Sequence, residues 1–97
     1  MKYRFLEAAK EELDEAVAHY ESLRAGLGTE LAQEVQNAIQ RIVDFPNAWT
    51  PLSKNVYCCR TKRFTYGVLY TLRDQEILIV AVMHLHRKPG YWKGRLR

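Results

Sequence analysis

The N-terminal part of the chain shows two kinds of hydrophobic spacing. Residues 2–6 alternate polar and apolar side chains, which predicts a short strand that needs a partner strand elsewhere. From residue 7 the apolar positions recur at intervals of three and four, as on one face of an amphipathic helix: Leu6, Ala9, Leu13, Ala16, Val17, Tyr20 and Leu23. We expect the remaining, acidic face to be solvated or to form a partner surface; it holds Glu11, Glu12, Asp14, Glu15 and Glu21.

Glycines separate this helix from a second one. Gly26 stands where helices commonly end on a left-handed residue, and Gly28 or Thr29 opens the next helix. Helical spacing then continues through Leu31, Val35, Ala38, Ile39 and Ile42. The Phe45-Pro46 pair ends it, because the residue before a proline is disfavoured in the helical conformation. The pattern predicts a hairpin of two antiparallel helices.

Strand patterns dominate the second half of the chain. Residues 47–55 are predicted to form a loop, and strands are expected at 56–62, 66–72 and 77–86. The last of these is apolar on both faces until its end, which is typical of a central strand. A polar turn at 73–76 joins the last two strands.

These elements predict one α+β domain over residues 1–97, in the order β-α-α-β-β-β. The first strand must reach the three-stranded meander over the helical hairpin. We therefore expect a four-stranded, mainly antiparallel sheet with the helical hairpin packed on one face. The other face or its rim is left for function.

Composition excludes several classes of protein. With 47% hydrophobic residues the chain is not expected to be disordered. No apolar run approaches the roughly 20 residues of a membrane helix, and we expect no signal peptide at the N-terminus and no membrane partner. Cys58 and Cys59 are adjacent and point to opposite faces of a strand, so neither a disulfide framework nor a zinc knuckle is expected. A reduced, cytoplasmic protein is the simplest interpretation.

Charge is divided unevenly between the two halves. Residues 1–53 hold five Lys and Arg against nine Asp and Glu, a net charge of −4. Residues 54–97 hold ten against two, a net charge of +8. This division predicts that the C-terminal half builds a surface facing a polyanion.

The basic half also contains groups suited to phosphate chemistry. Arg60 and Lys62 share strand parity, and so do His84 and His86. In a meander these two strand ends lie toward the same end of the sheet. Cations, a base and an acid gathered there would bind phosphate and support phosphodiester cleavage.

Further residues are candidates for nucleic-acid or target binding: Lys54, His84, Lys88, Trp92, Lys93 and Arg95. Arginine donates two parallel hydrogen bonds to a phosphate, and Trp92 with Tyr91 is suited to stacking on a base. The alternative is a solvated basic face with Trp92 packed against the sheet edge. Because a zinc site needs three or four ligands, the two histidines predict no metal site, and no cofactor is expected.

Several stretches together carry a family resemblance. They are the helical hairpin, the Pro46-Asn47-Ala48-Trp49 segment after it, residues 63–70 and 77–87 of the sheet, and Pro89-Gly90-Tyr91-Trp92 in the tail. In this order and spacing the chain resembles, over nearly its whole length, the RelE/ParE superfamily of toxins from bacterial type II toxin–antitoxin modules. The resemblance implies the same β-α-α-β-β-β fold. It also implies a cognate antitoxin that wraps and neutralises the toxin in a hetero-oligomer.

The resemblance implies two competing mechanisms. RelE-like members are metal-free ribonucleases that cleave mRNA, often at the ribosome, whereas ParE-like members poison DNA gyrase and are not known to cleave by themselves. By position, the catalytic candidates are Arg60, Lys62, Arg63, His86, Arg87 and Tyr91. We expect mRNA cleavage, mainly on account of Lys62, His86 and Tyr91. Gyrase poisoning is the alternative, and a non-toxic nucleic-acid-binding module is the second alternative.

Overall fold

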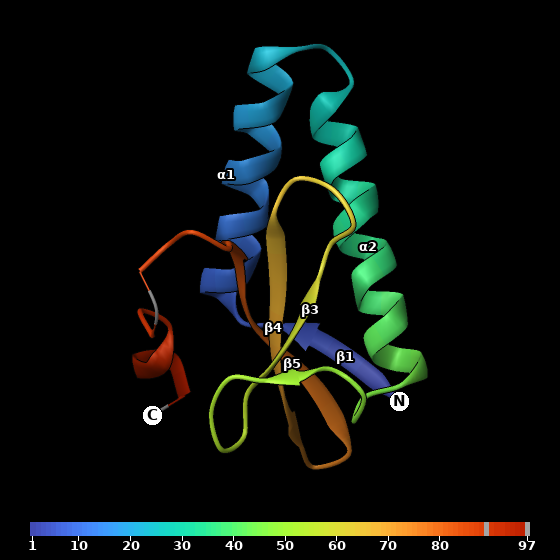
Figure 1. Cartoon of the computed structure of the whole chain (residues 1–97), viewed down its shortest axis with the longest axis vertical. Coiled ribbons are helices and arrows are strands. Elements are labelled where there is room, and N and C mark those ends of the chain that lie inside the picture. The colour runs from blue at the N-terminus through green and yellow to red at the C-terminus, as the bar shows by residue number, and fades with distance from the viewer. Residues whose placement is uncertain (89, 97) are drawn as a thin grey trace.

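The computed structural model describes residues 1–88 and 90–96. Helices α1 (Glu7–Leu23) and α2 (Leu27–Asp44) form a hairpin that packs on one face of a sheet and projects past its end (Figure 1). A strand precedes the hairpin and the other strands follow it. The predicted α+β class is therefore confirmed.

The sheet has five strands in the order β1-β5-β4-β3-β2. β1 (Lys2–Phe5) lies parallel to β5 (Glu76–His84), while β4 (Tyr66–Arg73) pairs antiparallel with β5 and with β3 (Tyr57–Arg60). The first strand thus reaches the meander as expected. The predicted count of four is wrong, because β2 (Thr50–Pro51) pairs with β3 inside the stretch predicted to be a loop. Two residues cannot show an alternating pattern, and a proline argues against a strand in the interior of a sheet.

Two strands end earlier than predicted, and Lys62 and His86 therefore lie in turns. β3 ends at Arg60 and β5 ends at His84. The turn after β3 contains two consecutive non-glycine residues with left-handed backbone conformations, which a strand cannot accommodate. The shared strand faces expected for Arg60 with Lys62, and for His84 with His86, are corrected accordingly.

Residues 24–28, which we call the hairpin tip, connect the two helices and are held by a side chain of α1. The Glu21 carboxylate accepts hydrogen bonds from the backbone N–H groups of Gly26 (2.8 Å) and Gly28 (3.0 Å). These bonds, the one from Gly26 foremost, lower the pKa of the Glu21 carboxyl. Gly26 is left-handed as predicted, with φ 87°, but it is the N-cap of α2 rather than the end of α1, which closes on an extended Arg24. The second helix therefore begins at Leu27 and not at the predicted Gly28 or Thr29. A Cβ atom on Gly28 would lie 2.4 Å from the carbonyl oxygen of Val17, so the helices pack closely here.

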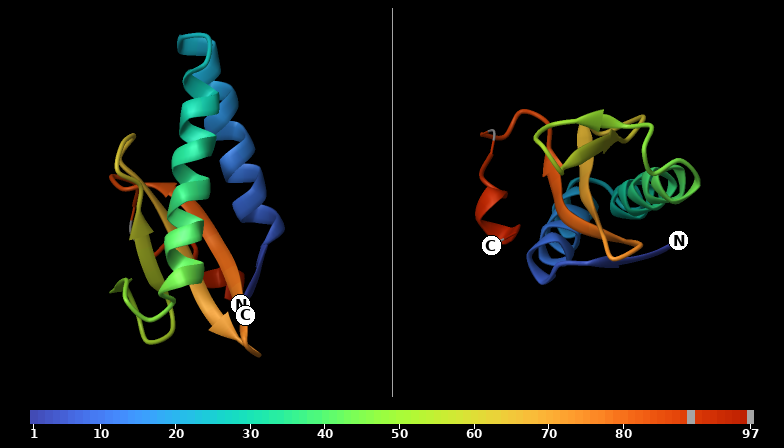
Figure 2. Two further views of the ribbon diagram at one scale, coloured as in Figure 1. Left: turned by 90° about the vertical axis from the view of Figure 1, so that its right-hand side faces the viewer. Right: turned by 90° about the horizontal axis from the view of Figure 1, so that it is seen from below.

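Apolar side chains are buried on both faces of the sheet. The helix-side cluster contains Leu31, Val35, Ile39, Ile42, Val68, Tyr70, Ile77 and Ile79. The opposite cluster contains Val56, Cys58, Leu69, Val80, Ala81, Met83 and Trp92. Figure 2 shows the C-terminal segment, which ends in the short 3-10 helix η1 (Lys93–Leu96), across the sheet from α2. The face expected to be left for function is thus partly covered by the chain itself.

Candidate functional site

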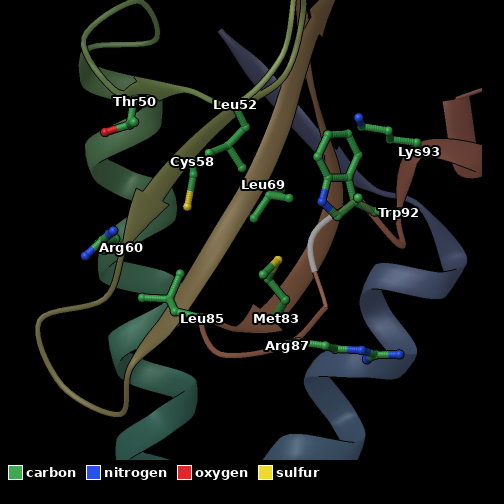
Figure 3. Close-up of a pocket in the computed structure, with 11 residues that line it drawn as sticks. Thr50, Leu52, Cys58, Arg60, Leu69, Met83, Leu85, Arg87, Trp92 and Lys93 are labelled. Atoms are coloured by element: carbon green, nitrogen blue, oxygen red, sulfur yellow. The ribbon is translucent and has the colours of Figure 1, made fainter.

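A cavity of about 290 Å³ lies on the sheet face opposite the helices (Figure 3). Its floor comes from β3, β4 and β5, one side comes from the segment around β2, and the other comes from the C-terminal segment. The lining residues are Thr50, Leu52, Cys58, Arg60, Leu69, Met83, Leu85, Arg87, Gly90, Trp92 and Lys93. Most of this lining is apolar, so the cavity offers hydrophobic contact area to a ligand.

Three exposed cations line the same cavity. Arg60 ends β3, Arg87 follows β5, and Lys93 begins η1. The fold therefore brings together two of the catalytic candidates and one of the target-binding candidates from distant parts of the sequence. Cations around an apolar floor suit an anionic partner that also carries apolar groups.

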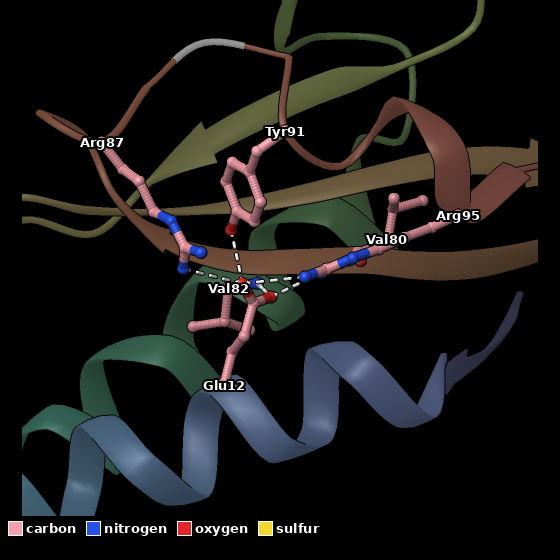
Figure 4. A network of polar contacts seen from close by, with 6 residues as sticks. All are labelled: Glu12, Val80, Val82, Arg87, Tyr91 and Arg95. Atoms are coloured by element: carbon pink, nitrogen blue, oxygen red, sulfur yellow. Dashed lines mark hydrogen bonds and ion pairs between the residues drawn. The ribbon is translucent and has the colours of Figure 1, made fainter.

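The carboxylate of Glu12, on α1, contacts several polar groups near the C-terminus (Figure 4). Glu12 accepts hydrogen bonds from the Tyr91 hydroxyl (2.5 Å), from Arg95 (2.7 and 3.2 Å) and from the backbone N–H of Val82 (3.2 Å), and Arg87 lies 3.4 Å away. Its side chain is only 11% exposed. A carboxylate removed from water to this extent is stable only with such a set of donors.

The Tyr91 hydroxyl is committed to this carboxylate. Burial, followed by the hydrogen bond and the negative charge of Glu12, raises the pKa of Tyr91 well above its usual range. The guanidinium of Arg87 stacks over the Tyr91 ring, 3.9 Å from its centre. The neutral phenol is therefore the favoured form of Tyr91 in the folded protein.

A second groove of about 230 Å³ lies on the α1 side and shares Arg87 with the first cavity. His84 lines it, and its ring meets those of Tyr66 and His86 edge to face, at 5.5 and 5.1 Å between centres. The backbone N–H of His86 donates to Nδ1 of His84 over 3.2 Å. The two predicted histidines thus lie together, His84 in the groove and His86 next to it, and neither lines the cavity.

Two catalytic candidates lie apart from the cavity, in the turn between β3 and β4. The guanidinium of Arg63 pairs with Glu30 of α2 (3.3 Å), and its backbone N–H donates to Glu34 (2.9 Å). Lys62, next to it, is exposed. The turn is therefore tied to α2, and neither cation lines the cavity.

The remaining target-binding candidates divide into buried and exposed residues. Trp92 is only 4% exposed and packs in the apolar cluster, as in the alternative considered from the sequence. Arg95 is occupied by Glu12 and by the carbonyl oxygen of Val80, 3.0 Å away. Lys54 and Lys88 are exposed and do not line the cavity. Trp92 thus forms part of the apolar lining of the cavity, and Arg95 is held beside it by Glu12 and Val80.

Comparison with known protein families identifies the chain. The model described as "ParE toxin of type II toxin-antitoxin system, parDE" matches residues 3–89, which is most of its length. The chain belongs to this toxin family. The toxin-family resemblance predicted from the sequence is therefore confirmed, and no curated protein matches the toxin in sequence.

Solved structures show the same fold at low sequence identity. A chromosomal ParDE system from P. aeruginosa matches with a TM-score of 0.67 and 15% identity, over 89% of the toxin and 97% of that chain. The isolated E. coli RelE toxin matches at 0.66 and 16%, over 99% and 96%. The RelBE2 toxin–antitoxin complex from Mycobacterium tuberculosis matches at 0.58 and 22%, over 86% and 95%. At these identities the likeness establishes the fold alone.

Sequence reasoning missed Glu12, the residue with the most partners in the site. It was grouped with the solvated acidic face, yet it follows Ala9 by three residues and precedes Ala16 by four. Both alanines are buried, so Glu12 lies on the buried stripe of the toxin's first helix. A charged residue at core spacing, in a chain with a basic tail, was the available signal.

Other chemistry is limited in the described part of the toxin. Residues 1–88 and 90–96 contain no group of three His, Cys, Asp or Glu side chains arranged to hold a metal ion. Within the same residues, no helix is both long and apolar enough to span a bilayer. Burial raises the pKa of the Cys58 thiol to about 11, which keeps this cavity-lining thiol protonated at neutral pH. Pro89, the first residue of the tail motif, lies outside the described residues.

Proposed function

We propose that this toxin arrests growth by poisoning DNA gyrase and does not itself cleave RNA. Membership of the ParE toxin family supports this mechanism. The observation that carries it is the hydrogen bond from the Tyr91 hydroxyl to the Glu12 carboxylate. The proposal reverses the order of the two mechanisms expected from the sequence.

This hydrogen bond disfavours the acid–base chemistry that RNA cleavage requires. Cleavage by a 2′-hydroxyl needs an available base and acid, and cations to stabilise the charged phosphorane. Glu12 occupies the Tyr91 hydroxyl and pairs with Arg87. It also adds a negative charge next to both, which repels a phosphate. A phenol with a raised pKa is in addition a poor proton donor at neutral pH.

In this proposal the cation-rimmed cavity is the surface that contacts gyrase or its bound DNA. Arg60 and Lys93 are exposed at its rim and have no acidic partner among the described residues. The toxin also forms a hetero-oligomer with a cognate antitoxin that neutralises it. The ParDE and RelBE2 structures, which are toxin–antitoxin systems of the same fold, support this partner.

Cleavage of mRNA is the second candidate function. It is favoured by the three cations around one cavity and by the nearby pair of histidines. In that mechanism one of the histidines, rather than Tyr91, would have to act as the acid or base, because the Tyr91 hydroxyl is occupied.

The decisive experiment measures both targets with the same purified toxin. We expect inhibited supercoiling and accumulated cleaved DNA with gyrase, while mRNA from induced cells stays intact. Arg60→Ala and Lys93→Ala should weaken the inhibition, whereas the control Lys54→Ala, outside the cavity, should not. Untouched gyrase together with fragmented mRNA would overturn the proposal in favour of RNA cleavage. Normal growth on induction would leave the non-toxic binding module.

A tyrosine variant tests in vivo whether toxicity depends on the Tyr91 hydroxyl. Tyr91→Phe removes the hydroxyl but keeps the ring under Arg87. Gyrase poisoning predicts that the variant still arrests growth, because the cavity and its cations remain. A ribonuclease that relied on Tyr91 would lose its toxicity in a folded variant.

A further inference from the structure

The C-terminal strap, residues 90–96, forms one side of the cavity but is weakly attached through its backbone. Gly90, Trp92 and Lys93 of the strap line the cavity. In the described part of the chain, the strap's backbone hydrogen bonds run within the strap, from Lys93 to Gly90 and from Arg95 to Trp92. Since no strand ladder fixes it to the sheet, side chains must hold it in place.

Two side-chain attachments perform this task. The first is apolar: Trp92 is buried in the cluster on the sheet, with Tyr91 and Leu96 packed against it. The second is Glu12, whose carboxylate binds Tyr91 and the guanidinium of Arg95. The apolar contact resists removal of the strap but is non-directional, whereas the charged hydrogen bonds set its orientation.

Glu12 itself contributes nothing to the lining of the cavity. Its side chain reaches the strap from α1. The same carboxylate also accepts a hydrogen bond from the backbone N–H of Val82, which joins it to β5. The carboxylate thus links α1, β5 and the strap at one point (Figure 4). Its Arg95 partner is 21% exposed and also donates to the carbonyl oxygen of Val80, so this point is largely shielded from solvent.

We propose that Glu12 is a positioning residue. From outside the cavity it fixes the strap, and it thereby determines the shape of the cavity through which the toxin engages its target. The part concerning the target rests on the proposed function. The part concerning the strap rests only on the contacts above. Loss of the carboxylate releases Tyr91 and Arg95 together, so the strap shifts and Trp92 gains exposure while the helices and β5 remain folded.

Fluorescence of Trp92 tests the strap directly. Trp49→Phe leaves Trp92 as the only tryptophan and keeps an aromatic ring at the half-buried position 49. In this background we expect Glu12→Gln to shift Trp92 emission to longer wavelength and to increase acrylamide quenching several-fold. The matched control is Glu11→Gln, an exposed neighbour on the same helix, which should change neither. Glu12→Asp, which keeps the charge, should restore part of the parent emission.

Hydrogen exchange distinguishes a moved strap from a damaged fold. In Glu12→Gln we expect faster exchange at the strap amides and unchanged exchange in β4 and in β5, apart from the Val82 amide that donates to Glu12. Unchanged emission and strap exchange would overturn the proposal, and so would a uniform increase over the whole sheet. If Glu12→Gln does not fold, Arg95→Met removes the Glu12–Arg95 contact from the strap side instead. The same changes in Trp92 emission and strap exchange are then expected, and the same two contrary results would overturn the proposal.

Activity then tests the link to the target. We expect Glu12→Gln to lose most of the gyrase inhibition that Glu11→Gln retains. If the strap moves but the inhibition is unchanged, the role of Glu12 in target engagement is overturned and its role in strap position stands. If the wild-type toxin leaves gyrase untouched, the proposed function fails instead, and the fluorescence result is unaffected.

Discussion

Two glutamates on α1 anchor two regions of the molecule in different ways. At the hairpin tip, Glu21 is exposed and binds backbone N–H groups that are five and seven residues away in sequence. Glu12 is 11% exposed and binds groups that are 70 to 83 residues away. The first closes a local turn, whereas the second holds the chain end against the sheet.

The difference shows that solvent and sequence distance, rather than residue type, decide what a carboxylate contributes. Water screens an exposed charge and competes for its hydrogen bonds, so such contacts contribute little to stability. A largely buried carboxylate has no such competitor, and removing it leaves its partners buried and unsatisfied. Variants at the two regions should therefore differ in magnitude and in how far their effects extend.

The largest effect is expected at the buried anchor. Glu12→Ala leaves the guanidinium of Arg95 and the Tyr91 hydroxyl without their carboxylate, which should cost about 3 kcal/mol of unfolding free energy. Urea denaturation monitored by circular dichroism measures this difference. Glu11→Ala, on the exposed face, is the control and should stay close to wild type. A loss at Glu12 no larger than that of the control would contradict the buried-anchor interpretation.

Close packing makes the hairpin tip sensitive in its own way. Gly28→Ala places a methyl group 2.4 Å from the carbonyl oxygen of Val17, so the helices must separate, at a cost of about 2 kcal/mol. Gly94→Ala is the control, since a Cβ atom there meets nothing within 4 Å. The same denaturation experiment compares the two. Equal stability of the two variants would show that the helices separate at the hairpin tip without a loss of unfolding free energy.

The sequence predicts features that depend on neighbouring residues far better than contacts between residues that are distant in sequence. Spacing identified both helices, and the left-handed conformation of Gly26 was correct, although this glycine caps the start of α2 rather than the end of α1. The strands of the meander were also found, although two were extended into turns and the two-residue β2 was missed. These features depend on neighbours in sequence, and for them periodicity and turn chemistry are sufficient signals.

The candidate site was only partly predictable for the same reason. Arg60, Arg87 and Lys93 were selected from the basic half, and they do line one cavity. The role of Glu12 depends on a pairing across the whole chain, and hydrophobic periodicity carries no information about which distant group a charge meets. Trp92 was ambiguous because an aromatic residue in a basic tail fits both a stacking platform and a buried wall.

A smaller effect is expected from a single hydroxyl of the Glu12 network. Tyr91→Phe removes one hydrogen bond to the carboxylate but keeps the ring against Arg87, which should cost about 1 kcal/mol. Tyr57→Phe is the control, because its hydroxyl has no hydrogen-bond partner among the described residues. Thermal unfolding of both variants gives the comparison. A Tyr91→Phe variant as stable as its control would mean that the Tyr91 hydroxyl adds nothing to the stability that the Glu12 network provides.

The smallest effect is expected at Glu21, and it depends on pH. Backbone hydrogen bonds lower the pKa of this carboxyl below its ordinary value of 4.5, so its stabilising effect is present at neutral pH and is lost as pH falls through the folded-state pKa. Wild type should therefore melt slightly above Glu21→Gln at pH 7, and the gap should close in acid. Glu11→Gln, which lacks such bonds among the described residues, should show no gap of this kind. A Glu21 gap that persists or widens in acid would mean that the glutamate side chain acts through packing rather than through its charge.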